Sequence, residues 1–434
     1  MKLSIIIITT FALLKPVSSS AQLNVEKQNV IIDSLCVKLE RYYIYPEVAT
    51  KVVHFIHEQQ ANQVYSPITD ENTFAGQVTA DLRLAGNDQH LRLEYSENIL
   101  PDQNDEPYVM TEDDKKEMEQ FFLHQNYGVR KVEVLKGNIG LIDFSCICGA
   151  DIAGEKYAEI MNYLSHTDAL IIDLRSCRGA MGMDGIPFLS SYFFDGSVHL
   201  NDLIWRKDNA LEQKWTYAYV PGKRYLDKPV YILTSARTFS GGEGFSYHLQ
   251  AQKRATIIGE QTRGGANPGA SIKVSDHFSS FIPLGITYNP ITKSSWEGIG
   301  VTPDSLIKAN RALYAAHQLA LNHCIGKSED SEWKANLENI LTELNENPPA
   351  FKTVPFELKG YENAKEVFVT GTFNNWARKT IPLTKKGNIW SAEVECEPGR
   401  IQYQFIVDEI PMLDPDNELT VKEGEYTNSV KTLK

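Results

Sequence analysis

Residues 129–259 alternate between short apolar strands and helical stretches, a pattern that predicts helices covering a central sheet. Two segments, 169–174 and 230–233, are interpreted as buried strands. A polar loop over 175–185 follows the first of them, and a helix over 241–252 follows the second after a short turn. The expected fold class of this region is therefore α/β (α+β).

Flanking segments of different character divide the chain further. Apolar residues recur at helical spacing before the core, which predicts a helical N-terminal domain over 22–128 with an irregular acidic stretch at 96–119. The core itself is expected over 129–326. A helical linker over 327–349 ends at two prolines. Short strands separated by turn signals then predict an all-β immunoglobulin-like sandwich over 350–434.

Residues 1–21 have a positively charged start, an apolar stretch and the small residues Ser19-Ser20-Ala21, which is typical of a secretory signal. We therefore expect an exported protein, periplasmic or secreted, and soluble after signal removal. No later segment approaches about 18 uninterrupted apolar residues, so no membrane span is expected. The net charge of -13, without any Lys/Arg-rich run, argues against nucleic acid as a partner.

Six cysteines remain after the signal, and export would permit disulfides, whose pairing the sequence leaves open. Cys146 and Cys148 point to the same face of a predicted strand, and we interpret them as buried apolar residues rather than a redox pair. No Cys/His cluster has the spacing of a zinc site. We therefore expect neither a metal nor a cofactor.

Ser240 stands between the buried strand 230–233 and a helix whose next two residues are glycines. The free N–H groups and the positive end of the helix dipole would lie beside its hydroxyl, where they would stabilise an oxyanion. The alternative is an N-cap role, with Glu243 completing a capping box. Ser235, at a strand end, and Ser246, inside the helix, are less suited to be nucleophiles.

Four motifs follow one another in the core: Asp173-Leu-Arg-Ser-Cys-Arg-Gly179, Ser240-Gly-Gly, Gly259-Glu-Gln-Thr-Arg-Gly264-Gly265, and Glu297-Gly-Ile-Gly-Val-Thr-Pro303-Asp304. In this order they resemble the tail-specific (C-terminal processing) serine peptidase family, over about residues 130–325 and the stretch around His90. The resemblance implies a crotonase-like core and hydrolysis through an acyl-enzyme intermediate.

The same resemblance implies the other site residues. The tail-specific branch places a basic Lys where this chain has Gly265. The tricorn-core and retinoid-binding-protein-like branch takes its base from an Asp-x-His segment, which Asp88-Gln89-His90 matches. Glu297 would orient His90, and the backbone N–H groups of Gly241 and Gly179 would form the oxyanion hole. His90 is then expected about 2.6 to 3.2 Å from the Ser240 hydroxyl.

The other two residues of the implied triad also have structural alternatives. His90 could be a structural residue, and Glu297 could cap a hairpin. Glu243, Arg237 and Arg263 are interpreted as helix-start and loop-anchoring charges. Only about 40 residues separate His90 from the core, too few for the PDZ domain that tail-specific peptidases usually carry. The specificity of those enzymes for C-terminal residues is therefore not carried over.

Residues 356–434 resemble the glycogen-binding type of carbohydrate-binding module. Trp376 matches one aromatic platform and Asn428 a further sugar contact, whereas Pro411 and Gln404 stand where a second platform and a Lys are usual. This favours a structural or protein-docking sandwich over a glucan-binding one.

The sequence thus predicts an exported serine endopeptidase that hydrolyses peptides or partly unfolded proteins. One alternative is a binding protein for an apolar ligand or peptide, in which the triad is a relic. The other is a cell-envelope protein that the sandwich tethers to a polysaccharide; a protein bound through the sandwich is a further possible partner.

Overall fold

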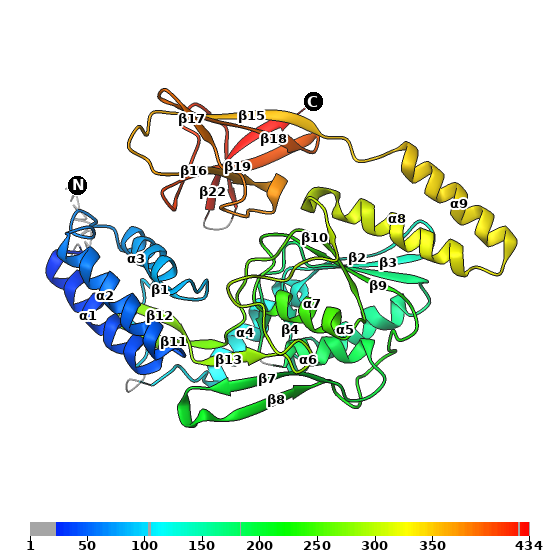
Figure 1. Cartoon of the computed structure of the whole chain (residues 1–434), viewed down its shortest axis with the longest axis horizontal. Helices are drawn as coiled ribbons and strands as arrows, with labels where there is room; N and C mark the ends of the chain where they lie inside the picture. Colours follow the sequence, from blue (N-terminus) through cyan, green and yellow to red (C-terminus); the bar gives the residue numbers. More distant parts are fainter. Residues whose placement is uncertain (1–22, 103–105, 183, 424–425, 434) are drawn as a thin grey trace, which may run out of the picture.

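The computed structural model describes residues 23–102, 106–182, 184–423 and 426–433. The predicted signal, residues 1–21, lies outside the described residues. Figure 1 shows N-terminal helices in blue, a central mixed core in cyan to yellow, and a C-terminal sandwich in orange to red that lies above the core. Within the described ranges, no helix is long and apolar enough to cross a membrane.

A six-stranded sheet forms the centre of the core, in the order β14-β10-β9-β5-β3-β2. Its strands are β2 (Val129–Leu135), β3 (Ile139–Phe144), β5 (Ala169–Asp173), β9 (Val230–Thr234), β10 (Thr256–Gly259) and β14 (Ser305–Leu306). Neighbours pair in parallel except β2 and β3, which are antiparallel. The predicted strands 169–174 and 230–233 are therefore adjacent, central and buried.

Helices cover both faces of this sheet. One face packs on α5 (Ala150–Leu164), α6 (Gly185–Ser190) and α7 (Gly241–Ala251). The other packs on α8 (Ala309–Lys327), which α9 (Ser331–Glu346) contacts in turn. Apolar side chains alternate between the two faces, with Ile172 on the first and Ile171 on the second. The α9 helix lies within the predicted linker.

Smaller sheets surround the core. One contains β13 (Gly285–Tyr288), β7 (His199–Trp205) and β8 (Leu211–Trp215). The short parallel pair β4 (Ile147–Cys148) and β6 (Ala180–Met181) fastens the loop after β5 to the core. Three short 3-10 turns complete this part: η1 (Asn126–Gly128), η2 (Ser191–Phe193) and η3 (Lys207–Asn209).

The N-terminal part consists of α1 (Val25–Tyr42), α2 (Pro46–Ala61) and α3 (Glu71–Gly86), as the helical spacing predicted. The next strand, β1 (Arg92–Tyr95), pairs with β12 (Phe278–Pro283), which pairs with β11 (Gly269–Lys273). Apolar side chains of β11 and β12 pack into the core of the three helices. The N-terminal part is therefore joined to the segment between β10 and β14 of the central sheet.

The stretch predicted to be irregular contains a helix, α4 (Glu112–His124). Thr111 and Asp114 form its capping box, and three acidic residues occupy its first turn, where the helix dipole favours negative charge. The prediction of irregular structure over 96–119 is wrong at its C-terminal end, because these acidic residues are a helix start.

The C-terminal part is an antiparallel sandwich, as predicted. One sheet contains β15 (Lys352–Lys359), β18 (Ile389–Cys396) and β17 (Thr384–Lys386). The other contains β16 (Val367–Gly371), β19 (Gly399–Val407), β22 (Tyr426–Leu433) and β21 (Thr420–Glu423), with β20 (Ile410–Met412) paired to β19. All six cysteines are unpaired, and Cys148 is fully buried beside the partly buried Cys146.

Candidate active site

Ser240 lies directly before the first residue of α7, on the turn that follows β9. Its backbone angles, φ 51° and ψ -114°, are unfavourable for a residue with a side chain. Serine hydrolases hold their nucleophile on such a strained strand-to-helix turn. The neighbouring hydroxyls are both committed, since Ser235 donates to Arg175 O at 2.6 Å and Ser246 to Gly242 O at 2.8 Å.

Gly179 lies beside Ser240: a Cβ added to Gly179 would be 3.8 Å from the Ser240 Cβ. Its φ of 153° favours glycine. A Cβ on Gly241 would be 2.3 Å from the backbone nitrogen of Ala180, so the two glycine segments touch. Among the described residues, neither the Gly179 nor the Gly241 N–H has an acceptor. Both are free to donate to an oxyanion.

The imidazole of His90 packs on Phe239, the residue before Ser240, with ring centroids 4.6 Å apart. It also stacks on Phe281 at 5.8 Å, and His90 is only 6% exposed. The pKa of His90 is lowered to about 3, mainly by burial and then by the positive charges of Arg92, Arg263 and Arg83. The ring is therefore neutral near pH 7, the form that accepts a proton.

None of the hydrogen bonds among the described residues joins His90 to Ser240, and the contact of about 2.6 to 3.2 Å stays a prediction. The imidazole instead contacts the ring of Phe239, which directly precedes Ser240. The Nδ1 atom of His90 is buried without a hydrogen-bond partner and lies 4.0 Å from Asp88 Oδ1.

Glu297 is bound to the loop before β11. Its Oε2 accepts the N–H groups of Ala266 at 2.5 Å and Asn267 at 2.9 Å. Its Oε1 is buried and, like Nδ1 of His90, has no partner. Burial, followed by the nearby Asp88 carboxyl, raises the pKa of Glu297. The structure therefore does not pair Glu297 with His90, but it leaves unsatisfied the two groups that a triad would join.

Asp88, the first residue of the Asp-x-His segment, holds the backbone of His90. Its carboxylate accepts the backbone N–H of His90 at 2.9 Å and the Tyr43 hydroxyl at 3.0 Å. Its Oδ1 lies 4.0 Å from Nδ1 of His90, and its negative charge raises the pKa of Glu297. Sequence reasoning used this Asp only as part of a motif and did not assign it a contact.

Glu243 connects the nucleophile turn to the following loop. Its side chain is fully buried and accepts the Ser240 N–H at 2.8 Å, the Gly265 N–H at 2.9 Å, the Gly264 N–H at 2.6 Å and the Thr262 hydroxyl at 2.5 Å. Burial raises its pKa to about 7, against the effect of these bonds. Glu243 and Ser240 form the capping box that the sequence offered as the alternative for Ser240, and the interpretation of Glu243 as a helix-start and loop-anchoring residue is confirmed.

Gly265 stands where the tail-specific branch has its basic Lys. A Cβ at this position would lie 2.2 Å from Phe239 Cε2 and 2.8 Å from His90 Cε1. The space that a lysine side chain would need is therefore occupied by the ring of His90 and its packing partner.

The two candidate sugar-binding residues differ in environment. Asn428 is only 4% exposed, and its side chain donates to Gln402 Oε1 at 2.9 Å. Trp376 is partly exposed and follows Asn375, in the loop after η4 (Thr372–Asn374). The Asn375 carbonyl accepts a hydrogen bond from Arg237 Nη1 at 2.7 Å, so this loop is docked on the core.

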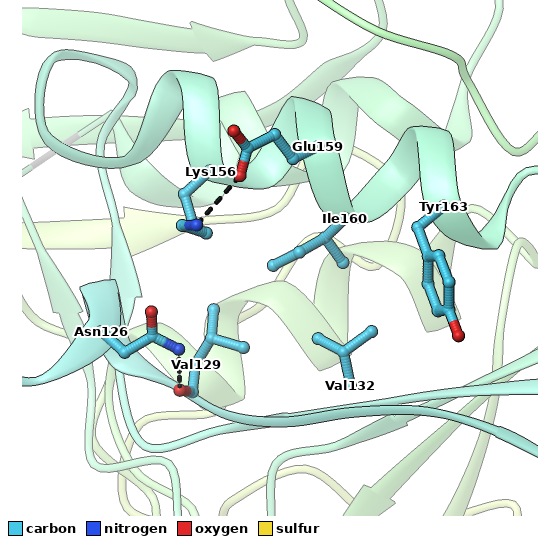
Figure 2. Close-up of a pocket in the computed structure, with 7 residues that line it drawn as sticks. All are labelled: Asn126, Val129, Val132, Lys156, Glu159, Ile160 and Tyr163. Atoms are coloured by element: carbon cyan, nitrogen blue, oxygen red, sulfur yellow. Dashed lines mark hydrogen bonds and ion pairs between the residues drawn. The ribbon is translucent and has the colours of Figure 1, made fainter.

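The hollow in Figure 2 lies elsewhere, between α5 and β2 with the adjoining η1. An ion pair of 2.9 Å between Lys156 and Glu159 closes one side of it. None of the candidate site residues lines this hollow, and it offers no nucleophile. Its lining residues are Asn126, Val129, Val132, Lys156, Glu159, Ile160 and Tyr163.

Comparison with known families places this site in a serine-type peptidase domain. Residues 138–307 match the model of Peptidase family S41, and residues 24–135 match the N-terminal domain of that peptidase in eukaryotic IRBP. The chain therefore contains a peptidase family S41 domain together with the family's N-terminal domain. Residues 354–434 match the glycogen recognition site of AMP-activated protein kinase.

Individual relatives match different parts of the chain. The human 5'-AMP-activated protein kinase subunit beta-2 is 32% identical over 110 residues, which are 25% of this chain and 38% of the relative. A lipoprotein from Streptococcus agalactiae shares 13% identity, covers 72% of this chain and 99% of its own, and has a TM-score of 0.45. The photosystem II D1 C-terminal processing protease shares 11% identity, covers 65% and 94%, and has a TM-score of 0.41.

Proposed function

We propose that this protein is an exported serine endopeptidase that hydrolyses peptides or partly unfolded proteins through Ser240, His90 and Glu297. Residues 129–326 form the proposed catalytic domain, and residues 22–128 supply the base. The observation that carries the proposal is the strained backbone of Ser240, at φ 51°, between β9 and α7. The neighbouring structure has to maintain that strain, which is typical of a functional residue.

In the proposed reaction, Ser240 Oγ attacks the scissile carbonyl carbon while His90 takes the hydroxyl proton. The N–H groups of Gly241 and Gly179 donate to the resulting oxyanion. The amine leaves with the proton from His90, and water then hydrolyses the ester by the same route. Catalytic hydrogen bonds often form fully only when substrate binds. The proposed reaction accordingly requires the His90 ring to approach Ser240 on substrate binding.

Glu297 is the proposed orienting acid. Its unpaired Oε1 and the unpaired Nδ1 of His90 support this role, because buried polar atoms normally have partners. Asp88 holds the backbone of His90 and is the proposed positioning residue. Removal of the Glu297 carboxylate is expected to lower kcat more than KM.

A fluorophosphonate probe tests the nucleophile on the purified protein. We expect the wild-type protein and Ser246→Ala to be labelled, and Ser240→Ala to remain unlabelled. Equal labelling of wild type and Ser240→Ala would refute the proposal. His90→Asn is expected to slow labelling by about 100-fold or more, the usual contribution of a general base.

For the sandwich we propose a docking role rather than glucan binding. The hydrogen bonds of Asn375 to the core and of Asn428 to Gln402 support this assignment. A glucan pull-down of the full chain is expected to fail. Retention on glucan that is lost in Trp376→Ala would favour the polysaccharide tether instead.

A further inference from the structure

Six arginines from three parts of the chain gather around His90 and Ser240. They are Arg83 and Arg92 from the N-terminal part, Arg178, Arg237 and Arg263 from the core, and Arg378 from the sandwich. We call them the arginine group. The whole chain has a net charge of -13, so this local excess of positive charge opposes the overall composition.

Three members lie around His90. Arg92 lies over the Phe281 ring at 4.3 Å and donates to the His90 carbonyl at 3.3 Å. Arg263 lies over Phe239 at 5.0 Å and donates to Gln89. Arg83 donates to the carbonyl of Leu91 at 3.0 Å. Their side chains are thus held beside the proposed base.

The other three belong to the same cluster, because Arg178 and Arg378 lie close enough to Arg237 and Arg263 to lower the pKa of both. Arg178 directly precedes Gly179, and Arg237 comes three residues before Ser240. Arg237 Nη1 donates to the carbonyl of Asn375, which brings the sandwich loop to this edge of the core. Arg378 follows in the same loop and is exposed.

Few of these arginines form an ion pair, although the buried carboxyl groups of Asp88 and Glu243 lie near Arg83 and Arg263. Arg92 pairs with Glu94 at 2.7 Å, whereas the other five form no ion pair with any described residue. Burial and the neighbouring arginines lower the pKa of Arg83 and of Arg237 to about 10. Glu409 is a further carboxylate near Arg83, Arg263 and Arg378, and it pairs with Lys379.

Unpaired cations held together repel one another, and an anionic ligand relieves that repulsion. We propose that the arginine group binds acidic peptides, with Asp or Glu on both sides of the scissile bond. This inference rests on the proposed function, because it assigns the substrate class of the same site. A peptide is favoured over an anionic polysaccharide because five of the six arginines lie around the nucleophile and base rather than on the sandwich.

Three fluorogenic peptides test the substrate class. They share one cleavage sequence and differ only in flanking residues, which are Asp/Glu, Asn/Gln or Lys. We expect kcat/KM for the acidic peptide to exceed that for the amide peptide by about tenfold at low ionic strength, and the advantage to shrink in salt. Equal values for the three peptides would overturn the inference.

Two charge reversals on the sandwich provide the matched comparison. Arg378→Glu is expected to reduce the advantage of the acidic peptide about threefold or more, because it replaces an attraction with a repulsion. Arg400→Glu changes another exposed arginine of the same sandwich, outside the group, and should leave the ratio unchanged. Equal ratios in the two variants would count against the arginine group.

Binding to Ser240→Ala separates this inference from the proposed function. If the probe labels wild type but peptide charge has no effect, the peptidase proposal stands and the substrate class is wrong. If the probe does not label wild type but Ser240→Ala binds the acidic peptide in an Arg378-dependent way, the acidic-peptide inference stands and the peptidase proposal is wrong. Displacement of that peptide by polygalacturonate at lower concentrations than by unlabelled acidic peptide would overturn the peptide assignment.

Discussion

Gly265 is the single residue that makes room for His90, the proposed base. A lysine at this position would project into the rings of Phe239 and His90, so the tail-specific dyad and the His90 arrangement exclude each other sterically. Gly265 thus keeps open the space that the ring of the proposed base, His90, occupies.

A matched pair of substitutions tests this packing. Gly265→Ala is expected to lower the free energy of unfolding by about 1 to 3 kcal/mol, because the added methyl group overlaps two rings. Gly154→Ala makes the same change within α5, where nothing lies within 4 Å, and should be neutral or stabilising by up to about 1 kcal/mol. Urea unfolding measures both. Equal effects would contradict the packing argument.

His248 gives a prediction for the pH dependence of stability. It is buried, and burial followed by His199 lowers its pKa to about 3, against about 6.5 in an unfolded chain. Below pH 6.5 the unfolded state therefore binds more protons, so acid destabilises the fold. His248→Gln is expected to reduce the slope of unfolding free energy between about pH 4 and 6 by about 1.4 kcal/mol per unit. The same substitution at the exposed His54 is the control; coinciding slopes of wild type and His248→Gln would refute the prediction.

At the scale of elements, Glu243 links the start of α7 to the loop between β10 and β11. One carboxylate accepts from the Ser240 turn and from the Gly264–Gly265 segment, so the nucleophile and the space for the base are positioned by the same group. The loop geometry therefore depends on a side chain of the helix.

Glu243→Gln preserves volume but presents an amide donor to backbone N–H groups. We expect a loss of about 1 to 3 kcal/mol in unfolding free energy, the cost of a buried unsatisfied group, together with slower probe labelling of Ser240. Glu155→Gln, on the exposed side of α5, is the control for the chemical change. Unaltered stability and labelling in Glu243→Gln would show that the two loops hold their shape independently.

Sequence patterns predicted the elements that carry Ser240 and His90, because buried strands and helical spacing leave clear periodicities. They did not predict α8, β11 or β12, whose residues lay beyond the strands and helices that the pattern assigned. The start of α4 has a capping box, Thr111 with Asp114, which was legible in the sequence but was obscured by its acidic composition. The unpaired atoms of His90 and Glu297 depend on side-chain rotamers, which no periodicity encodes.

At the scale of the molecule, the sandwich is held on the core through the loop after η4. Asn375 adopts a left-handed conformation, φ 52° and ψ 31°, while its carbonyl accepts from Arg237 and its side chain from Ser176 at 3.4 Å. Lys308 and Arg311 add ion pairs to Glu395 at 2.6 and 3.3 Å. Exposed pairs of this kind contribute little, so the loop is the principal attachment.

Asn375→Val is expected to loosen the sandwich, because a β-branched residue resists the left-handed conformation at a cost of about 1 to 2 kcal/mol. Asn375→Gly also removes the side chain but accepts that conformation, and it should remain docked more firmly. Limited proteolysis of the linker at residues 347–351 measures the difference, with faster cleavage expected in the valine variant. Equal cleavage rates would contradict a conformational role for Asn375.

The pairing of β1 with β12 has a consequence for the order in which the protein is made. The segment bearing His90 cannot complete its sheet until residues 278–283 have left the ribosome, some 190 positions later. A growing chain therefore carries His90 without the partner of its strand over some 190 positions, and Ser240 is added only shortly before that partner. The three N-terminal helices share a core with β11 and β12, so their final packing also waits for this later segment.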